Sequence, residues 1–253
     1  METFFVDKGS IVRKIWGRSD TVLLIFAGAS AEFALNKSVD WLYFTGRLPA
    51  DPIGRLFSTV RYAQEIVFKE YNAALAAIDK ITAIHIGVEK MRGDKIPDTA
   101  YLDVLFMLID YSIRSFELLE RKLTEIEKSD IFTVFYRLGS RMGLQAIPDN
   151  YPDWKYKRME SVEKNLVRSS FSTDLYRKYH RSLGPFRYGI LLHTQTLLVP
   201  VRVRQLLSLP SFTLIYSVLQ IYKGARFLQM DGIFRAMLLP TKYQAQIAAL
   251  DIK

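Results

Sequence analysis

From Asp98 to Thr124 the sequence reads DTAYLDVLFMLIDYSIRSFELLERKLT, and this stretch decides the fold class. It contains neither glycine nor proline, and its apolar residues recur at helical spacing around almost the whole circumference. A helix that is apolar nearly all round has to be covered by other elements on every side. We therefore predict a long helix over 98–124 in the middle of a helical bundle.

The sequence on both sides of this stretch has the same helical periodicity, and no alternating strand pattern with Asn-Gly or Asp-Gly turns occurs. A Pro, Asp and aromatic-rich segment, 144–156, is predicted to be a loop. Because no flexible linker separates two cores, we predict an all-α, single-domain helical bundle over 1–253. Further helices are expected at about 11–16, 21–36, 52–71, 74–92, 129–143, 157–182, 188–207 and 211–247.

The composition limits the chemistry that the chain can support. Its 253 residues include no cysteine and three histidines, His85, His180 and His193. The absence of cysteine excludes disulfides, Cys-zinc sites, iron–sulfur clusters and cysteine nucleophiles. Nucleotide-binding, serine-hydrolase and zincin motifs are absent, and no histidine follows a glutamate by three residues, as ferritin-like di-iron sites require.

Lysine and arginine number 35 against 26 acidic residues, which gives a net charge of +9. The basic residues are spread along the chain without a nucleic-acid-binding motif, so we expect no nucleic-acid partner. The charge is compatible with peripheral association with an anionic membrane surface. Pro210 interrupts the longest uncharged stretch, 205–222, which excludes it as a spanning helix, and the first residues lack a secretory pattern. We expect a cytoplasmic location.

His85 is the histidine in the most informative place, because it lies near the end of an apolar helical face formed by residues 75, 78, 81, 84 and 88. Three interpretations are open. The imidazole is a core group bonded to a carbonyl, an axial ligand of haem iron, or, with Glu89 four residues later, part of a non-haem metal site.

Arg55 and Thr59 are four residues apart, so they share one face of the helix that Asp51-Pro52 begins. They are either a solvated arginine with a threonine packed beside it, or an inward-facing pair suited to a haem propionate or to iron-bound oxygen.

Five short motifs follow one another along the chain. They are Phe26-Ala-Gly-Ala-Ser-Ala31, Asp51-Pro52-x-x-Arg55-Leu56-x-x-Thr59, Ile84-His85-x-x-Val88, Leu138-Gly139-Ser-Arg-Met-Gly143-Leu144 and Leu198-Val-Pro-Val-Arg202-x-x-x-Leu206. In this order they resemble the MpaB / rubber oxygenase (latex clearing protein) catalytic-domain family, and the resemblance is strongest over 20–210.

The resemblance implies an all-α protein that binds haem b and uses O₂ to oxidise a hydrophobic small molecule of the isoprenoid or polyene kind. His85 would be the iron ligand, with Arg55 and Thr59 as the cofactor-binding and catalytic pair beside the haem. Ser58 stands where a rubber oxygenase can place a lysine on the distal side. Two alternatives remain: a non-catalytic helical protein that binds a lipid or pigment, and a non-haem iron enzyme that uses His85 and Glu89.

Overall fold

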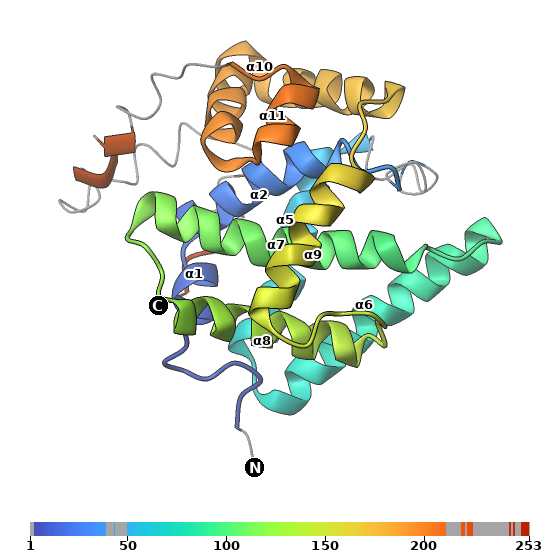
Figure 1. Ribbon diagram of the computed structural model, residues 1–253, viewed down its shortest axis with the longest axis vertical. Coiled ribbons are helices and arrows are strands. Elements are labelled where there is room, and N and C mark those ends of the chain that lie inside the picture. The colour runs from blue at the N-terminus through green and yellow to red at the C-terminus, as the bar shows by residue number, and fades with distance from the viewer. Residues whose placement is uncertain are drawn as a thin grey trace.

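The computed structural model describes residues 3–38, 43, 50–210, 219–220, 222–224, 243, 245 and 249–252. In these ranges the chain is helical and forms no β-ladder, which confirms the all-α prediction (Figure 1). No described helix is long and apolar enough to cross a membrane. The helices are α1 (Ile11–Trp16), α2 (Ser19–Phe33), α5 (Pro52–Phe68), α6 (Tyr71–Arg92), α7 (Asp98–Leu119), α8 (Glu125–Arg141), α9 (Tyr151–Asn165), α10 (Ser170–Leu198) and α11 (Val201–Leu207).

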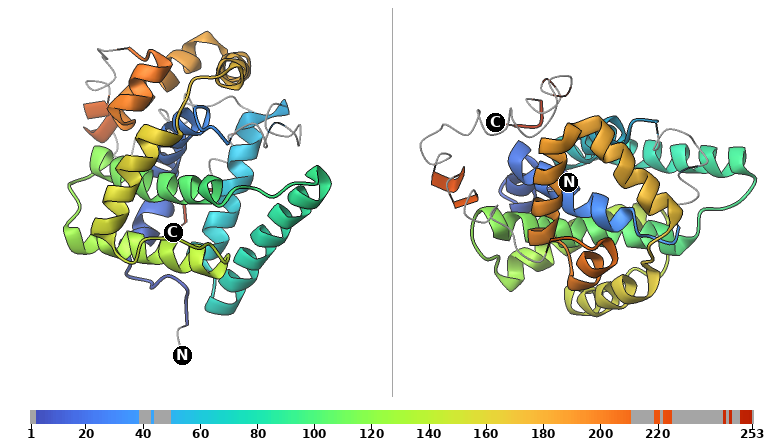
Figure 2. Two further views of the ribbon diagram at one scale, coloured as in Figure 1. Left: turned by 45° about the vertical axis from the view of Figure 1, so that its right-hand side comes forward. Right: turned by 90° about the horizontal axis from the view of Figure 1, so that it is seen from above.

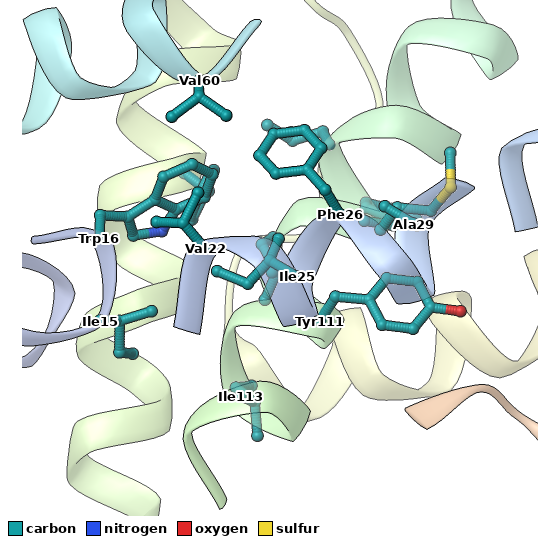
Figure 3. Packing of buried hydrophobic residues seen from close by; sticks show 14 of the residues in the cluster. Ile15, Trp16, Val22, Ile25, Phe26, Ala29, Val60, Tyr111 and Ile113 are labelled. Atoms are coloured by element: carbon teal, nitrogen blue, oxygen red, sulfur yellow. The ribbon is translucent and has the colours of Figure 1, made fainter. Parts of the chain in front are cut away.

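The helix pair α2 and α7 forms the centre of the bundle, as the apolar stretch predicts. Trp16, at the end of α1, packs edge-on against Phe26 of α2, with ring centroids 6.3 Å apart, and donates a hydrogen bond to Ser112 of α7 (Figure 3). The two central helices approach closely because Gly28 of α2 faces Tyr111 of α7. A Cβ added to Gly28 would lie 2.3 Å from the Tyr111 ring, so no larger residue fits without displacing it.

A buried ion-pair network holds the third helix of the centre, α9, against this pair. Arg158 of α9 forms ion pairs with both Glu32 of α2 and Asp110 of α7, and the Tyr111 hydroxyl donates to Glu32 at 3.0 Å. Burial alone would lower the pKa of Arg158, but the charges of Glu32 and Asp110 outweigh it and raise the pKa above its usual range. Arg114 pairs with Asp110 from the outside at 2.7 Å, so two cations neutralise two carboxylates.

Two boundaries near the central helix differ from the prediction. Helix α7 ends at Leu119, and Thr124, predicted to belong to it, is the N-cap of α8. Thr124 accepts from the Glu127 N–H, and the Glu127 carboxylate accepts from the Thr124 N–H, so this reciprocal capping box starts a helix four residues earlier than expected.

The predicted loop over 144–156 is wrong in its second half, because α9 begins at Tyr151. Asn150 caps it by accepting from the Asp153 N–H, and Pro152 occupies the first turn, where its missing N–H costs nothing. The helices predicted over 157–182 and 188–207 are broken instead at 166–169 and 199–200. The helix predicted over 211–247 lies largely outside the described residues.

The last described residues close the junction between α1 and α2. The Gly17 carbonyl accepts from the Ile252 N–H, and Asp251 accepts from the Ser19 N–H at 2.8 Å. Gln64 of α5 donates to the Leu250 carbonyl at 2.8 Å. This segment therefore joins the start of the chain to α5.

Replacing Arg158 with methionine should lower the free energy of unfolding by about 3–5 kcal/mol, because two buried carboxylates lose their shared cation while the volume changes little. Urea unfolding of the variant measures this. The control is Arg121→Met, which removes an exposed pair with Glu127 and should change stability far less. Equal losses in the two variants would contradict a central role for the buried network.

Candidate functional site

The α5–α6 hairpin carries the residues that the sequence singled out. The two helices pack against each other and run in opposite directions on either side of a turn at residues 69–70. The start of α5, with Arg55, therefore lies beside the later part of α6, with His85. Figure 1 shows α6 extending from the body of the bundle toward the α6–α7 connection.

His85 is half-buried instead of facing the core, which corrects part of the predicted pattern. The apolar face of α6 is buried near its start, where Ile78 is fully covered, but Ile84 is 36% exposed and Ile86 is 44% exposed. The reason is that the later part of α6 extends beyond the helices that cover its first half. His85 thus lies at the margin of the bundle, between apolar side chains that reach solvent.

The electrostatic surroundings favour the neutral form of the His85 imidazole. Burial is the largest cause of its lowered pKa, and the positive charge of Arg55 is the second. The Glu89 carboxylate and the Ile81 carbonyl act in the opposite direction without reversing the shift. The structure therefore brings Arg55 and His85 together, although they are 30 residues apart in sequence, and gives His85 the protonation state that a metal ligand needs.

Thr59 and Ser58 lie one turn after Arg55, and both are half-buried. Each hydroxyl donates to the Arg55 carbonyl, Ser58 at 2.7 Å and Thr59 at 3.2 Å. Both hydroxyl oxygens keep the capacity to accept a hydrogen bond. Arg55 and Thr59 share one side of α5 as expected, and the roles assigned to them stay predictions.

Glu89 is bound elsewhere than to His85. Its Oε1 accepts from the Ile96 N–H at 3.0 Å and from the Tyr101 hydroxyl at 3.3 Å, which ties the end of α6 to the loop and helix that follow. Within the described ranges, no group of three or more His, Asp or Glu side chains is arranged to hold a metal ion. The arrangement gives Glu89 a positioning role in the α6–α7 connection.

Tyr101 is the site residue that sequence reasoning missed. Its ring packs edge-on against the His85 imidazole, with centroids 5.2 Å apart and planes at 89°, and fixes one side of it. Burial, followed by the Glu89 charge, raises the pKa of Tyr101 above its usual range, so the hydroxyl stays protonated. Sixteen residues and a turn separate Tyr101 from His85, so no local spacing could have indicated the contact.

The His85 imidazole also fits the requirements of a haem ligand. Its Nδ1 is buried and has no hydrogen-bond partner of ordinary geometry among the described residues. A neutral imidazole, a nearby guanidinium and exposed isoleucines together match the iron, propionates and apolar faces of a haem.

The other two histidines lie on α10. His180 packs edge-on against Tyr188, with ring centroids 4.9 Å apart, and is exposed. His193 is half-buried, and its Nδ1 has no hydrogen-bond partner in the described part of the chain. Neither histidine belongs to the group around His85, which lies on α5, α6 and α7.

The chain was compared with known protein families. The model described as ER-bound oxygenase mpaB/B'/Rubber oxygenase, catalytic domain, matches residues 14–225, which include α2 through α11. No curated protein and no solved structure matches the chain. The match confirms the resemblance carried by the sequence motifs.

The two charges that act on His85 should shift its pKa in opposite directions, and NMR titration of the imidazole signals measures this. The wild-type midpoint should lie below 6.5, the ordinary value of histidine. Arg55→Gln removes the charge that opposes protonation, so the pKa should rise, whereas Glu89→Gln should lower it further. The His85→Ala variant assigns the signal. Identical midpoints in all three proteins would show that Arg55 and Glu89 do not face His85.

Proposed function

Because the chain belongs to the mpaB/rubber oxygenase catalytic-domain family, we propose that it is a haem b-dependent oxygenase that acts with O₂ on a lipophilic substrate of the isoprenoid or polyene kind. The observation that carries the proposal is the half-buried, neutral His85 beside Arg55. Haem bound at this site would supply the redox chemistry that activates O₂.

In this proposal His85 is the protein ligand of the iron. A porphyrin supplies four nitrogens, so one imidazole completes the protein's share of the coordination in a chain that has three histidines and no cysteine. The lowered pKa keeps the nitrogen lone pair free of a proton at neutral pH. Tyr101, packed against the ring, limits its rotation and keeps it oriented.

Arg55 is assigned to a haem propionate. A guanidinium binds a carboxylate through two parallel hydrogen bonds, and a haem propionate offers such a carboxylate. Arg55 is half-buried and belongs to the same helical hairpin as His85, so it can bind the cofactor edge while His85 binds the metal.

Thr59 and Ser58 are the hydroxyl groups proposed to lie near the reacting oxygen. The Thr59 hydroxyl donates to the Arg55 carbonyl, which leaves its oxygen lone pairs available to orient a proton or a water molecule. A serine at position 58 does not ligate iron as lysine can, and its hydroxyl is held by the same carbonyl. We therefore propose that no protein group of α5 ligates the iron.

The domain organisation of the chain and its location in the cell are also proposals. We propose one domain over 1–253, supported by one large core cluster whose described members run from Phe5 to Leu250, beside a small one at Ile96 and Ala100. The exposed isoleucines beside His85 suit a lipophilic substrate, and the net charge of +9 suits peripheral contact with an anionic membrane from the cytoplasmic side. Nucleic acid is not among the proposed partners.

Hemin titration of the purified protein tests the haem assignment. The wild type should develop a Soret band at one equivalent of hemin, and His85→Ala should abolish the band or shift it strongly. His193→Ala is the matched control, because it removes another half-buried histidine and should leave the spectrum unchanged.

The outcome also separates the alternative functions. Bound iron without porphyrin would favour a non-haem enzyme, although Glu89 is already engaged by Ile96 and Tyr101. A co-purified lipid or pigment with no haem uptake would favour a non-catalytic binding protein. Failure to bind haem under any condition would overturn the proposal.

The Thr59 hydroxyl is tested separately from haem binding. Thr59→Val should lower kcat for oxygen uptake with a polyene substrate about 100-fold or more, since a group that assists proton transfer usually contributes about 10²- to 10⁴-fold. Haem content and the Soret band should persist, because valine has nearly the same shape. Thr59→Ser should retain most of the activity. Full activity in Thr59→Val would remove Thr59 from the catalytic residues.

A further inference from the structure

The second half of the molecule contains a cavity whose lining includes none of the residues around His85, which are Arg55, Glu89 and Tyr101 and are called the His85 group below. Helix α10 bends sharply at Gly184, whose φ of 75° and ψ of 167° lie outside the helical region and favour glycine. Pro185 follows directly. The α10 ribbon, yellow to orange in Figure 2, turns a corner at this point.

The bend brings the two arms of α10, residues 170–183 and 185–198, against each other. The rings of Tyr176 and Tyr188 lie 6.5 Å apart, whereas 12 residues of straight helix span about 18 Å. The Tyr176 hydroxyl donates across the bend to Gln195 at 2.9 Å, and Gln195 in turn donates to the Ala27 carbonyl of α2. The elbow is therefore anchored to the centre of the bundle and is a fixed part of the fold.

A cavity of about 410 Å³ lies inside this elbow, partly covered by the end of α11. Its volume is in the range of small-molecule binding sites. Its lining is divided by chemistry: Arg168, Arg177 and His180 are cationic or hydrogen-bond-donating, Tyr176 and Tyr188 are aromatic, and Leu192, Leu207, Leu209 and Pro210 are apolar. Ser172, Thr173 and Ser208 also line it, and no carboxylate lies in the part of the lining that the structure describes.

The two arginines of the cavity have no salt-bridge partner in the described part of the chain. The pKa of Asp174 is lowered mainly by its hydrogen bond with Lys178, and the charge of Arg177 contributes less. The ion pair of Asp174 is with Lys178, at 2.7 Å. The Thr173 hydroxyl donates to the Ser169 carbonyl, and Ser172 belongs to the capping box of α10, so these hydroxyls are engaged. The guanidinium groups are thus the free donors, beside an apolar wall.

From this division we infer that the α10 elbow binds an amphiphilic anion, with its carboxylate or phosphate head on Arg168 and Arg177 and its hydrocarbon chain along Leu192, Leu207 and Leu209. Arginine is suited to such heads because its planar fork donates two parallel hydrogen bonds. The inference does not depend on the haem assignment, since none of the lining residues belongs to the His85 group. The ligand class is a fatty acid or a single-chain alkyl phosphate.

Calorimetric titration of the full chain with decanoate and with decyl phosphate tests the inference and identifies the head. At least one of them should bind saturably, tenfold or more tightly than the neutral 1-decanol and than inorganic phosphate. The double variant Arg168→Gln/Arg177→Gln should raise the Kd at least tenfold, as expected for the loss of charge-assisted hydrogen bonds. Both arginines are exposed, so unfolding in the absence of ligand should be unchanged.

Two controls locate the binding. Arg181→Gln removes an exposed cation of the same helix outside the cavity lining and should leave the Kd within twofold. His85→Ala should do the same. The inference is overturned if decanol binds as tightly as the anions, if inorganic phosphate does, if neither amphiphile binds, if the double variant keeps the wild-type Kd, or if His85→Ala weakens binding as much as the double variant.

Discussion

The ion pair between Arg158 and Glu32 is the constraint on which the central packing depends. One buried guanidinium from α9 satisfies carboxylates from α2 and α7, so these three helices have to assemble together for any of the charges to be neutralised. Apolar packing alone leaves a helix free to rotate or slide against its neighbour, whereas a buried bidentate pair has one geometry. The contact of Gly28 with Tyr111 adds a steric limit to the same register.

The candidate site differs from this network because it lies at the half-buried margin of the bundle. Helices α5 and α6 form a hairpin whose far end extends beyond the covered core, and there His85 acquires both burial and access to solvent. A histidine in the centre would be satisfied by a carbonyl, and one on the open surface would be protonated more readily. The tether from Glu89 to Ile96 and Tyr101 keeps this projecting end ordered without using the imidazole.

The sequence predicted the elements whose causes are local and missed those that depend on distant partners. The apolar circumference of 98–119 and the Asp51-Pro52 start of α5 were visible as patterns, and the order of short motifs indicated the family. The capping box at Thr124 and the N-cap at Asn150 were also local signals, but Thr124 was included in the helix predicted over 98–124 and Asn150 in the loop predicted over 144–156. The contact of Tyr101 with His85 and the network of Arg158 join residues from different helices, so no spacing could have revealed them.

The closure of the α1–α2 junction has a consequence for how the chain folds. Ser19 and Asp251 are separated by 232 residues, so their hydrogen bond forms only after a very long loop has closed. Contacts of such high sequence separation slow folding, while neighbours such as α5 and α6 can pair early. The Ser19 N–H, at the start of α2, should therefore remain exposed to exchange with solvent until late in folding, when the last described residues dock on it.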